Sequence, residues 1–172
     1  NQSKKYKRVL KSYQLNVLDA SKKFIKICYN RIKKYSKDHK LVKMNYSKVL
    51  MTKFNGRYCT EYQKHPLINP DFIYIDGPSQ WQVDGKINGF SVNNFEMMPM
   101  LSDVLKYEHF LNPGTIILID GRSANSRFLK KNFQRNWVYH YIKTSDQHIL
   151  YLNEKPLGKW NLQQIDFFNK KN

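Results

Sequence analysis

The stretch Asp71-Phe-Ile-Tyr-Ile-Asp-Gly-Pro78 contains four consecutive apolar or aromatic residues, which are followed by an aspartate, a glycine and a proline. A second stretch, Thr115-Ile-Ile-Leu-Ile-Asp-Gly-Arg122, repeats this pattern. A short apolar run that ends at turn-forming residues is typical of a strand buried on both faces of a parallel sheet. We therefore expect two parallel strands that end at Asp76 and Asp120.

The segments around these two strands alternate between apolar runs and helix-like patterns, which predicts an α/β sandwich with a largely parallel sheet. A chain of 172 residues with 41% hydrophobic content is long enough for one core, so we expect a single domain over residues 1–172. Residues 47–65 carry an Asn55-Gly56 turn signal but have no assigned element, and residues 79–94 are expected to form a long active-site loop. The other expected elements are strands at 13–18 and 40–46, helices at 21–36, about 100–111 and 126–134, and an antiparallel hairpin of 137–142 with 148–152.

The positive charge is concentrated in the first third of the chain. Residues 1–64 contain 18 Lys or Arg residues and 3 acidic residues, whereas residues 65–172 contain 12 and 10, and the total net charge is +17. Such a basic region could bind nucleic acid, an acidic glycan, a phosphorylated substrate or a protein partner. A solvated lysine-rich surface is the alternative that the sequence leaves open.

The sequence contains no apolar stretch long enough to span a membrane and no apolar core of a signal peptide after its basic start. We therefore expect a cytoplasmic protein. The two cysteines, Cys28 and Cys59, are too few for a disulfide framework, and we expect both to be buried thiols. Nothing in the sequence specifies an oligomeric state.

Three aspartates follow expected strands, namely Asp19, Asp76 and Asp120. Ligands of open parallel sheets bind outside the carboxyl ends of the strands, so these residues are the first candidates for a site. An aspartate in this position also serves as a turn former or helix cap, and this structural alternative stays open for each of them.

The segments 71–78 and 111–122 resemble the fourth strand and the helix-to-fifth-strand region of class I S-adenosylmethionine-dependent methyltransferases, and Leu15-Asn-Val-Leu-Asp19 is similar to their second strand. The resemblance implies a three-layer Rossmann-like sandwich with a mostly parallel sheet and a C-terminal antiparallel hairpin. It also implies that S-adenosylmethionine is the cofactor, with the ribose on Asp19. Asp76, Gly77 and Pro78 would then lie on the cofactor side as well.

One defining feature of that family is missing from this sequence. The Gly-rich loop of a dinucleotide-type fold should precede Asp19 by roughly twenty residues, as the spacing of the βαβ unit requires. The first glycine is Gly56, and no G-x-G occurs in the chain. We expect a chain truncated before Asn1, which lacks the first strand and this loop; a domain that has lost cofactor binding is the alternative.

The resemblance to catechol O-methyltransferase-like enzymes implies a divalent metal between Asp76 and Asp120, with Gly121 in place of a family asparagine. Asn125 or water would supply the third ligand, and oxygen ligands favour Mg²⁺. Without a metal, Asp76 is a candidate general base. Trp81, Arg122 and Asn125 are the candidate substrate-binding residues.

The function expected from these residues is methyl transfer to an oxygen or nitrogen nucleophile of a small-molecule or glycan acceptor. Two alternatives belong to other classes. The first is a non-catalytic module that binds nucleic acid or another polyanion through the basic N-terminal third. The second is a transferase that acts on a nucleotide sugar.

Overall fold

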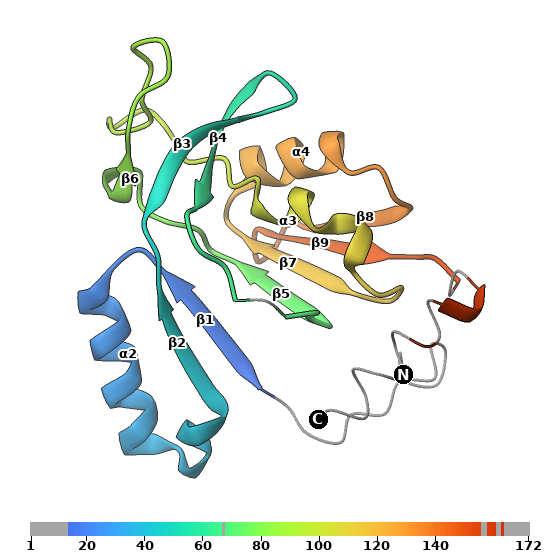
Figure 1. Ribbon diagram of the computed structural model, residues 1–172, viewed down its shortest axis with the longest axis horizontal. Coiled ribbons are helices and arrows are strands. Elements are labelled where there is room, and N and C mark those ends of the chain that lie inside the picture. The colour runs from blue at the N-terminus through green and yellow to red at the C-terminus, as the bar shows by residue number, and fades with distance from the viewer. Residues whose placement is uncertain (1–13, 67, 156–157, 161–162, 164–172) are drawn as a thin grey trace. The chain divides into compact units, whose positions relative to one another are not determined.

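A computed structural model describes residues 14–66, 68–155, 158–160 and 163 of the chain. The chain forms two compact units (Figure 1). The N-terminal unit comprises the described residues of 14–67 together with 77–103, and the C-terminal unit comprises 68–76 and the described residues from 104 onward.

The C-terminal unit is built on a four-stranded mixed sheet with the order β5-β7-β9-β8. Strand β5 (Phe72–Ile75) pairs in parallel with β7 (Ile116–Asp120). Strand β9 (Gln147–Leu152) pairs antiparallel with both β7 and β8 (Trp137–Ile142). The strands expected from the two apolar runs and the expected terminal hairpin are therefore confirmed.

The two faces of this sheet differ in burial. Helix α4 (Ser123–Asn132) lies over one face (Figure 1). Directly paired residues of neighbouring strands point to the same face, so Ile119 and His148 share that covered face. The next pair, Asp120 and Gln147, points to the opposite face. The fully buried side chains of this unit include Ile117, Ile119, Leu129, Leu150 and Leu152.

The N-terminal unit begins with a βαβ segment. Strand β1 (Leu15–Asp19) pairs in parallel with β2 (Val42–Tyr46), and helix α2 (Lys22–Tyr35) and the 3-10 helix η1 (Lys37–Leu41) connect them. The hydroxyl oxygen of Ser21 accepts the Phe24 backbone N–H at 3.2 Å, so Ser21 caps the start of α2. The expected strand, helix and strand of this region are confirmed.

The unassigned residues 47–65 form a β-hairpin of β3 (Val49–Phe54) and β4 (Arg57–Tyr62). Asn55 and Gly56 connect the strands with φ values of 48° and 76°, as a two-residue hairpin turn requires. Strand β6 (Val83–Asp84) pairs in parallel with β3. Buried Val49, Met51, Val83 and Val92 form the core of this part.

The expected three-layer Rossmann-like sandwich with a mostly parallel sheet is wrong. The described strands form three separate sheets, and the pairings β3–β4, β7–β9 and β8–β9 are antiparallel. Parallel neighbours require long crossover connections, whereas the two-residue turn after β3 and the short turn after β8 return the chain in the opposite direction. Helices therefore do not alternate with strands along the whole chain.

The expected helix at 100–111 is also wrong, because only α3 (Asp103–Lys106) and the 3-10 helix η3 (Glu108–Phe110) form there. The segment before α3 is extended, since Thr60 donates its backbone N–H to the Met100 carbonyl at 2.8 Å and Ser102 donates to the Thr60 carbonyl at 3.0 Å. The helix expected at 126–134 begins earlier, at Ser123. No helix in the described part of the chain has the length and apolar character needed to cross a membrane.

Candidate functional site

Two of the strand-end aspartates lie at one edge of the C-terminal unit. Ile75 and Ile119 are paired across β5 and β7, so Asp76, the next residue, and Asp120, the last residue of β7, lie side by side at the carboxyl ends of parallel strands. Tyr74 lies on the same face and donates its phenol proton to Oδ2 of Asp120 at 2.6 Å. We call Tyr74, Asp76 and Asp120 the aspartate edge.

The negative charge of the aspartate edge affects the pKa of Tyr74. Its pKa is raised to about 12, first by the hydrogen bond to Asp120, then by burial, and further by the negative charges of Asp120 and Asp76. Both carboxylates raise the pKa of the same phenol, so both lie close enough to interact with a single polar group bound at this edge. Asp76 is exposed and Asp120 is half-buried. The edge can therefore accept hydrogen bonds from a hydroxyl or amine that approaches from solvent.

The donor set at this edge does not fit a magnesium site. No group of three His, Cys, Asp or Glu side chains suited to a metal ion occurs in the part of the chain that the structure describes. Asn125, the expected third ligand and a candidate substrate residue, is fully buried on α4. An amide buried in this way has no access to an ion or a substrate in solvent, so neither role is available to it.

The other candidate residues in the C-terminal unit and at its border lie in the turns that follow β5 and β7. Arg122 is half-buried and precedes α4 as its N-cap residue. Gly77 has a φ of +75°, a left-handed conformation that favours glycine, and it turns the chain after Asp76. Pro78 is buried. These residues shape the turns after the two strands.

Asp19 and Trp81 belong to the N-terminal unit. Oδ1 of Asp19 accepts the Ser21 backbone N–H at 2.6 Å, so this aspartate shapes the turn into α2. Trp81 lies in a short 3-10 helix (Gln80–Gln82) and is 49% exposed. Its ring packs edge-to-face against Phe95 at a centroid distance of 4.8 Å. The exposed rings of Trp81, within the predicted loop of residues 79–94, and of Phe95, just after it, form an aromatic pair.

The residues present do not form a complete site for S-adenosylmethionine. The usual cradle brings a glycine-rich backbone close to the cofactor. The seven glycines of this chain all adopt positive φ, and no two of them are arranged as G-x-G. Asp19 uses one carboxylate oxygen for its own turn. The described residues therefore lack the glycine-rich cradle that S-adenosylmethionine needs.

The sequence reasoning missed a histidine cluster on the α4 face of the same sheet. His148 is 3% exposed, its Nε2 lies 2.9 Å from Ser123 Oγ, and its Nδ1 lies 2.8 Å from the Tyr139 hydroxyl. The Tyr141 ring stacks on the imidazole at 4.5 Å, and Tyr141 donates to Asp146 Oδ1 at 3.0 Å. No local sequence motif predicts this cluster, because its residues come from α4, β8, β9 and the turn between β8 and β9.

Burial lowers the pKa of His148, and the nearby Arg127 charge lowers it further, whereas Asp146 opposes this shift. The imidazole is therefore neutral at pH 7. One of its nitrogens carries a proton and donates a hydrogen bond, and the other nitrogen accepts a hydrogen bond. The cluster gives this end of the sheet a buried and hydrogen-bonded framework behind the aspartate edge.

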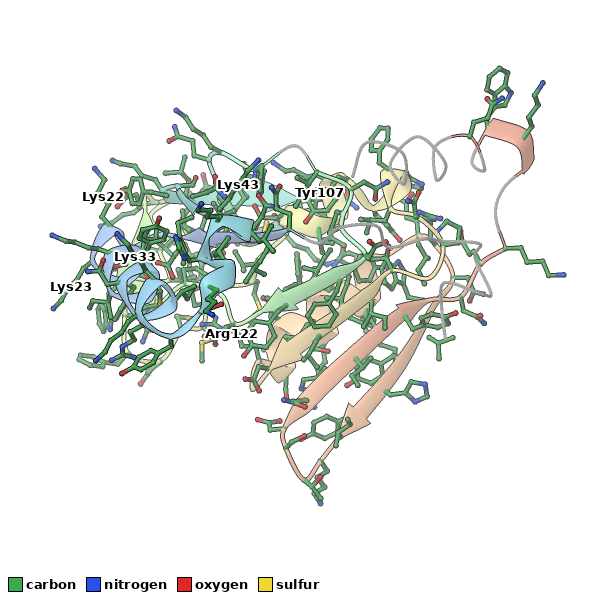
Figure 2. All side chains as sticks on the ribbon, turned by 90° about the horizontal axis from the view of Figure 1, so that it is seen from below. Lys22, Lys23, Lys33, Lys43, Tyr107 and Arg122 are labelled. Atoms are coloured by element: carbon green, nitrogen blue, oxygen red, sulfur yellow. The ribbon has the colours of Figure 1, made fainter. Side chains whose placement is uncertain are left out.

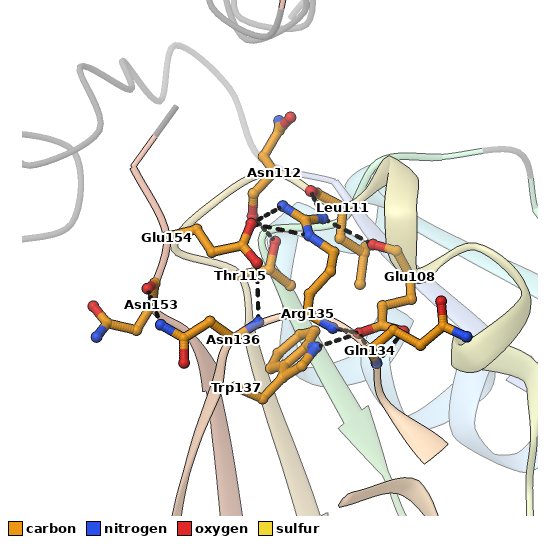
Figure 3. Close-up of polar contacts among 10 residues, drawn as sticks. All are labelled: Glu108, Leu111, Asn112, Thr115, Gln134, Arg135, Asn136, Trp137, Asn153 and Glu154. Atoms are coloured by element: carbon orange, nitrogen blue, oxygen red, sulfur yellow. Dashed lines mark hydrogen bonds and ion pairs between the residues drawn. The ribbon is translucent and has the colours of Figure 1, made fainter. Parts of the chain in front are cut away.

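A second missed feature is a clasp of Glu108, Arg135 and Glu154 in the C-terminal unit (Figure 3). Glu108 is 2% exposed, and its Oε1 accepts from the backbone N–H groups of Gln134 and Arg135 and from the Trp137 indole, at 3.0, 2.8 and 2.9 Å. Arg135 forms an ion pair with Glu154 at 2.7 Å. Because the carboxylate of Glu108 has these donors, the clasp is a structural element that ties η3 to the start of β8.

Cys59 is buried, as expected, but Cys28 is exposed on α2, so the expectation of two buried thiols is wrong for Cys28.

Comparisons with protein-family models, with curated proteins and with solved structures find no match. The site is therefore interpreted from its own geometry.

Proposed function

We propose that this chain provides the acceptor-binding edge of an S-adenosylmethionine-dependent methyltransferase that modifies a hydroxyl or amine of a small-molecule or glycan acceptor. The observation that carries the proposal is the position of Asp76 and Asp120 at the ends of adjacent parallel strands. The resemblance of the strand sequences supports it. The proposal rests on this edge and not on a Rossmann-like sandwich, which the chain does not form.

The chemistry assigned to the edge is binding and proton transfer. Methyl transfer needs an acceptor held in line with the methyl group and, for a hydroxyl, a base near its proton. Asp76 is exposed and serves as the base, whereas Asp120 is held in place by Tyr74 and orients the acceptor through a hydrogen bond. Each role needs an ionised carboxylate, which accepts a proton or a hydrogen bond from the acceptor.

The cofactor side of the proposal is tested directly, because the described residues lack a glycine-rich cradle. Calorimetric titration of the full-length protein with S-adenosylhomocysteine should show binding, both with and without Mg²⁺. The absence of heat in both titrations would contradict a methyltransferase function.

The acceptor side is tested with tritiated S-adenosylmethionine and a panel of phenols, sugars and amines. Asp76→Asn should lower methyl incorporation by 10²-fold or more, the usual contribution of a general base. Asp84→Asn is the matched control, since Asp84 is an exposed aspartate of the N-terminal unit that pairs with Lys48 at 3.5 Å. Equal losses in the two variants would remove Asp76 from the reaction.

We also place this enzyme in the cytoplasm. Cys28 and Cys59 are thiols rather than a disulfide, which suits a reducing compartment.

A further inference from the structure

Helix α2 has an unusual charge pattern for a surface helix. Six of its 14 residues are Lys or Arg, none is acidic, and none is buried. Figure 2 shows Lys22, Lys23 and Lys33 projecting from the ribbon of this helix. Surface helices that are merely solvated usually mix charges of both signs. The basic residues are Lys22, Lys23, Lys26, Arg31, Lys33 and Lys34.

Four residues of α2 form a stripe along one side of the helix. Lys22, Lys26, Tyr29 and Lys33 are spaced i, i+4, i+7 and i+11, so their side chains lie one above the other. The stripe is about 16 Å long at the helical rise per residue. All three lysines are exposed, and Tyr29 is 38% exposed. We call these four residues the α2 stripe.

The lysines near the start of α2 oppose the stability of the helix, whereas Lys33 and Lys34 in its last turn favour it. Lys22 and Lys26 place like charges at i and i+4, which is destabilising. Lys22 and Lys23 lie in the first turn, where the helix dipole disfavours cations, and this turn contains no acidic residue. A bound polyanion would offset this repulsion, because its negative charges lie close to the lysines.

Aromatic rings are interleaved with these charges. Lys22 Nζ lies 4.9 Å from the centroid of the Tyr46 ring on β2, and Tyr46 is 42% exposed. Lys34 Nζ lies 5.1 Å from the centroid of the Tyr35 ring, which is 77% exposed. Exposed rings beside phosphate-binding lysines are the features with which proteins stack unpaired bases.

From these observations we infer that the α2 stripe binds single-stranded nucleic acid, with the lysines on phosphates and Tyr29 against a base. An anionic membrane surface is a weaker fit, because Ile25 and Ile32 are half-buried and Phe24 is the one exposed side chain of this helix that is an apolar ring without a polar group. A duplex would use the lysines but would leave the exposed tyrosines without unpaired bases. The site is independent of the aspartate edge.

The test is fluorescence anisotropy of the full-length protein with labelled 15-nucleotide oligo-dT and oligo-U. The variant Lys22→Gln/Lys26→Gln/Lys33→Gln should bind at least tenfold more weakly. For this variant, the slope of log K against log salt concentration should be smaller in magnitude by about 2, because three phosphate contacts to a single strand are lost. Glutamine is a good helix former, so circular dichroism should show an unchanged fold.

A matched control changes three exposed lysines of the C-terminal unit, as Lys131→Gln/Lys143→Gln/Lys155→Gln. It has the same net charge as the α2 variant and should bind within twofold of the unmodified protein. Tyr29→Ala should weaken oligo-dT binding about fivefold and leave binding to a 15-base-pair duplex within twofold. Equal weakening by the two triple variants would overturn the site. Tighter binding to the duplex, or to phosphatidylserine vesicles, would overturn the choice of ligand.

Discussion

The phenol of Tyr74 donates a 2.6 Å hydrogen bond to Oδ2 of Asp120, a residue 46 positions further along the chain. The bond joins the parallel strands β5 and β7 on the face of the sheet opposite α4. It also holds the carboxylate of Asp120 in one orientation beside Asp76. The aspartate edge is thus positioned by a side chain that is itself part of the sheet.

This bond should be visible in the ionisation of tyrosine. The pKa of Tyr74 is raised from 10.0 to about 12, so its stabilising contribution is complete below pH 10 and is lost as the pH rises from 10 through 12. Spectrophotometric titration at alkaline pH should show one fewer late-ionising tyrosine in Tyr74→Phe. Tyr29→Phe, on α2, is the control, because it also removes one phenol but leaves the hydrogen bond from Tyr74 to Asp120 in place. If the Tyr74→Phe curve retains that late-ionising tyrosine, the hydrogen bond is not formed in solution.

Removal of the charge of Glu108 should destabilise the C-terminal unit. In Glu108→Gln, the carboxylate that accepts from two backbone N–H groups and the Trp137 indole becomes an amide whose NH₂ group faces donors. We expect the free energy of unfolding to fall by about 1.5–3 kcal/mol, the usual contribution of hydrogen bonds to a charged group. Urea denaturation measures this change. The exposed Glu96→Gln should have little effect, and a comparable loss there would mean that the clasp is unimportant.

Acid should weaken the same clasp through Glu154. Burial alone would raise the pKa of Glu154, but the hydrogen bonds from Arg135 and from the Asn136 backbone outweigh it, and the net shift is downward. The stability contributed by this carboxylate is therefore present above its ordinary pKa of 4.5 and is lost as the pH falls below that value. Unfolding curves between pH 6 and pH 3 should show a smaller acid dependence in Glu154→Gln. An unchanged dependence would contradict the assignment.

His148 should resist protonation. Its pKa is lowered from 6.5, first by burial, so the folded protein binds this proton less readily than the unfolded chain does. The stability that depends on neutral His148 is present above pH 6.5 and is lost as the pH falls through the folded-state value. Histidine NMR signals should show one ring that titrates below pH 6.5, and His148→Gln should abolish that signal. A His148 signal that titrates at or above pH 6.5 would contradict the buried cluster.

Local patterns in the sequence predicted individual elements well where the pattern was short and strong. The runs before Asp76 and Asp120 predicted β5 and β7, and the periodicity of residues 21–36 predicted α2. The Asn55-Gly56 turn was recognised, but its two flanking strands were not. Their residues mix polar and apolar types, and distant partners complete their hydrogen bonding, namely strand β6, residues 100–102 and the Asp103 carboxylate.

The positions of the candidate residues were predicted in part for the same reason, and their role as a site stays a prediction. The strand-end positions of Asp76 and Asp120 were predicted because a strand end is a local feature, and parallel pairing then places the two ends at one edge. Asn125 was misplaced because the local pattern started α4 three residues late and did not show that this asparagine is buried. The His148 cluster and the Glu108 clasp join residues that are far apart in sequence, so no local pattern shows them.

The sequence by itself determined where β5, β7 and α2 run, since a short apolar run or a helical period already limits the backbone locally. It also determined that the positive charge lies in the first third of the chain. Only the tertiary structure decided the direction in which β7 and β9 pair and which face of each strand is covered. Pairing direction and register depend on hydrogen bonds between distant segments, such as Asp120 with Gln147, and local periodicity carries no information about such partners.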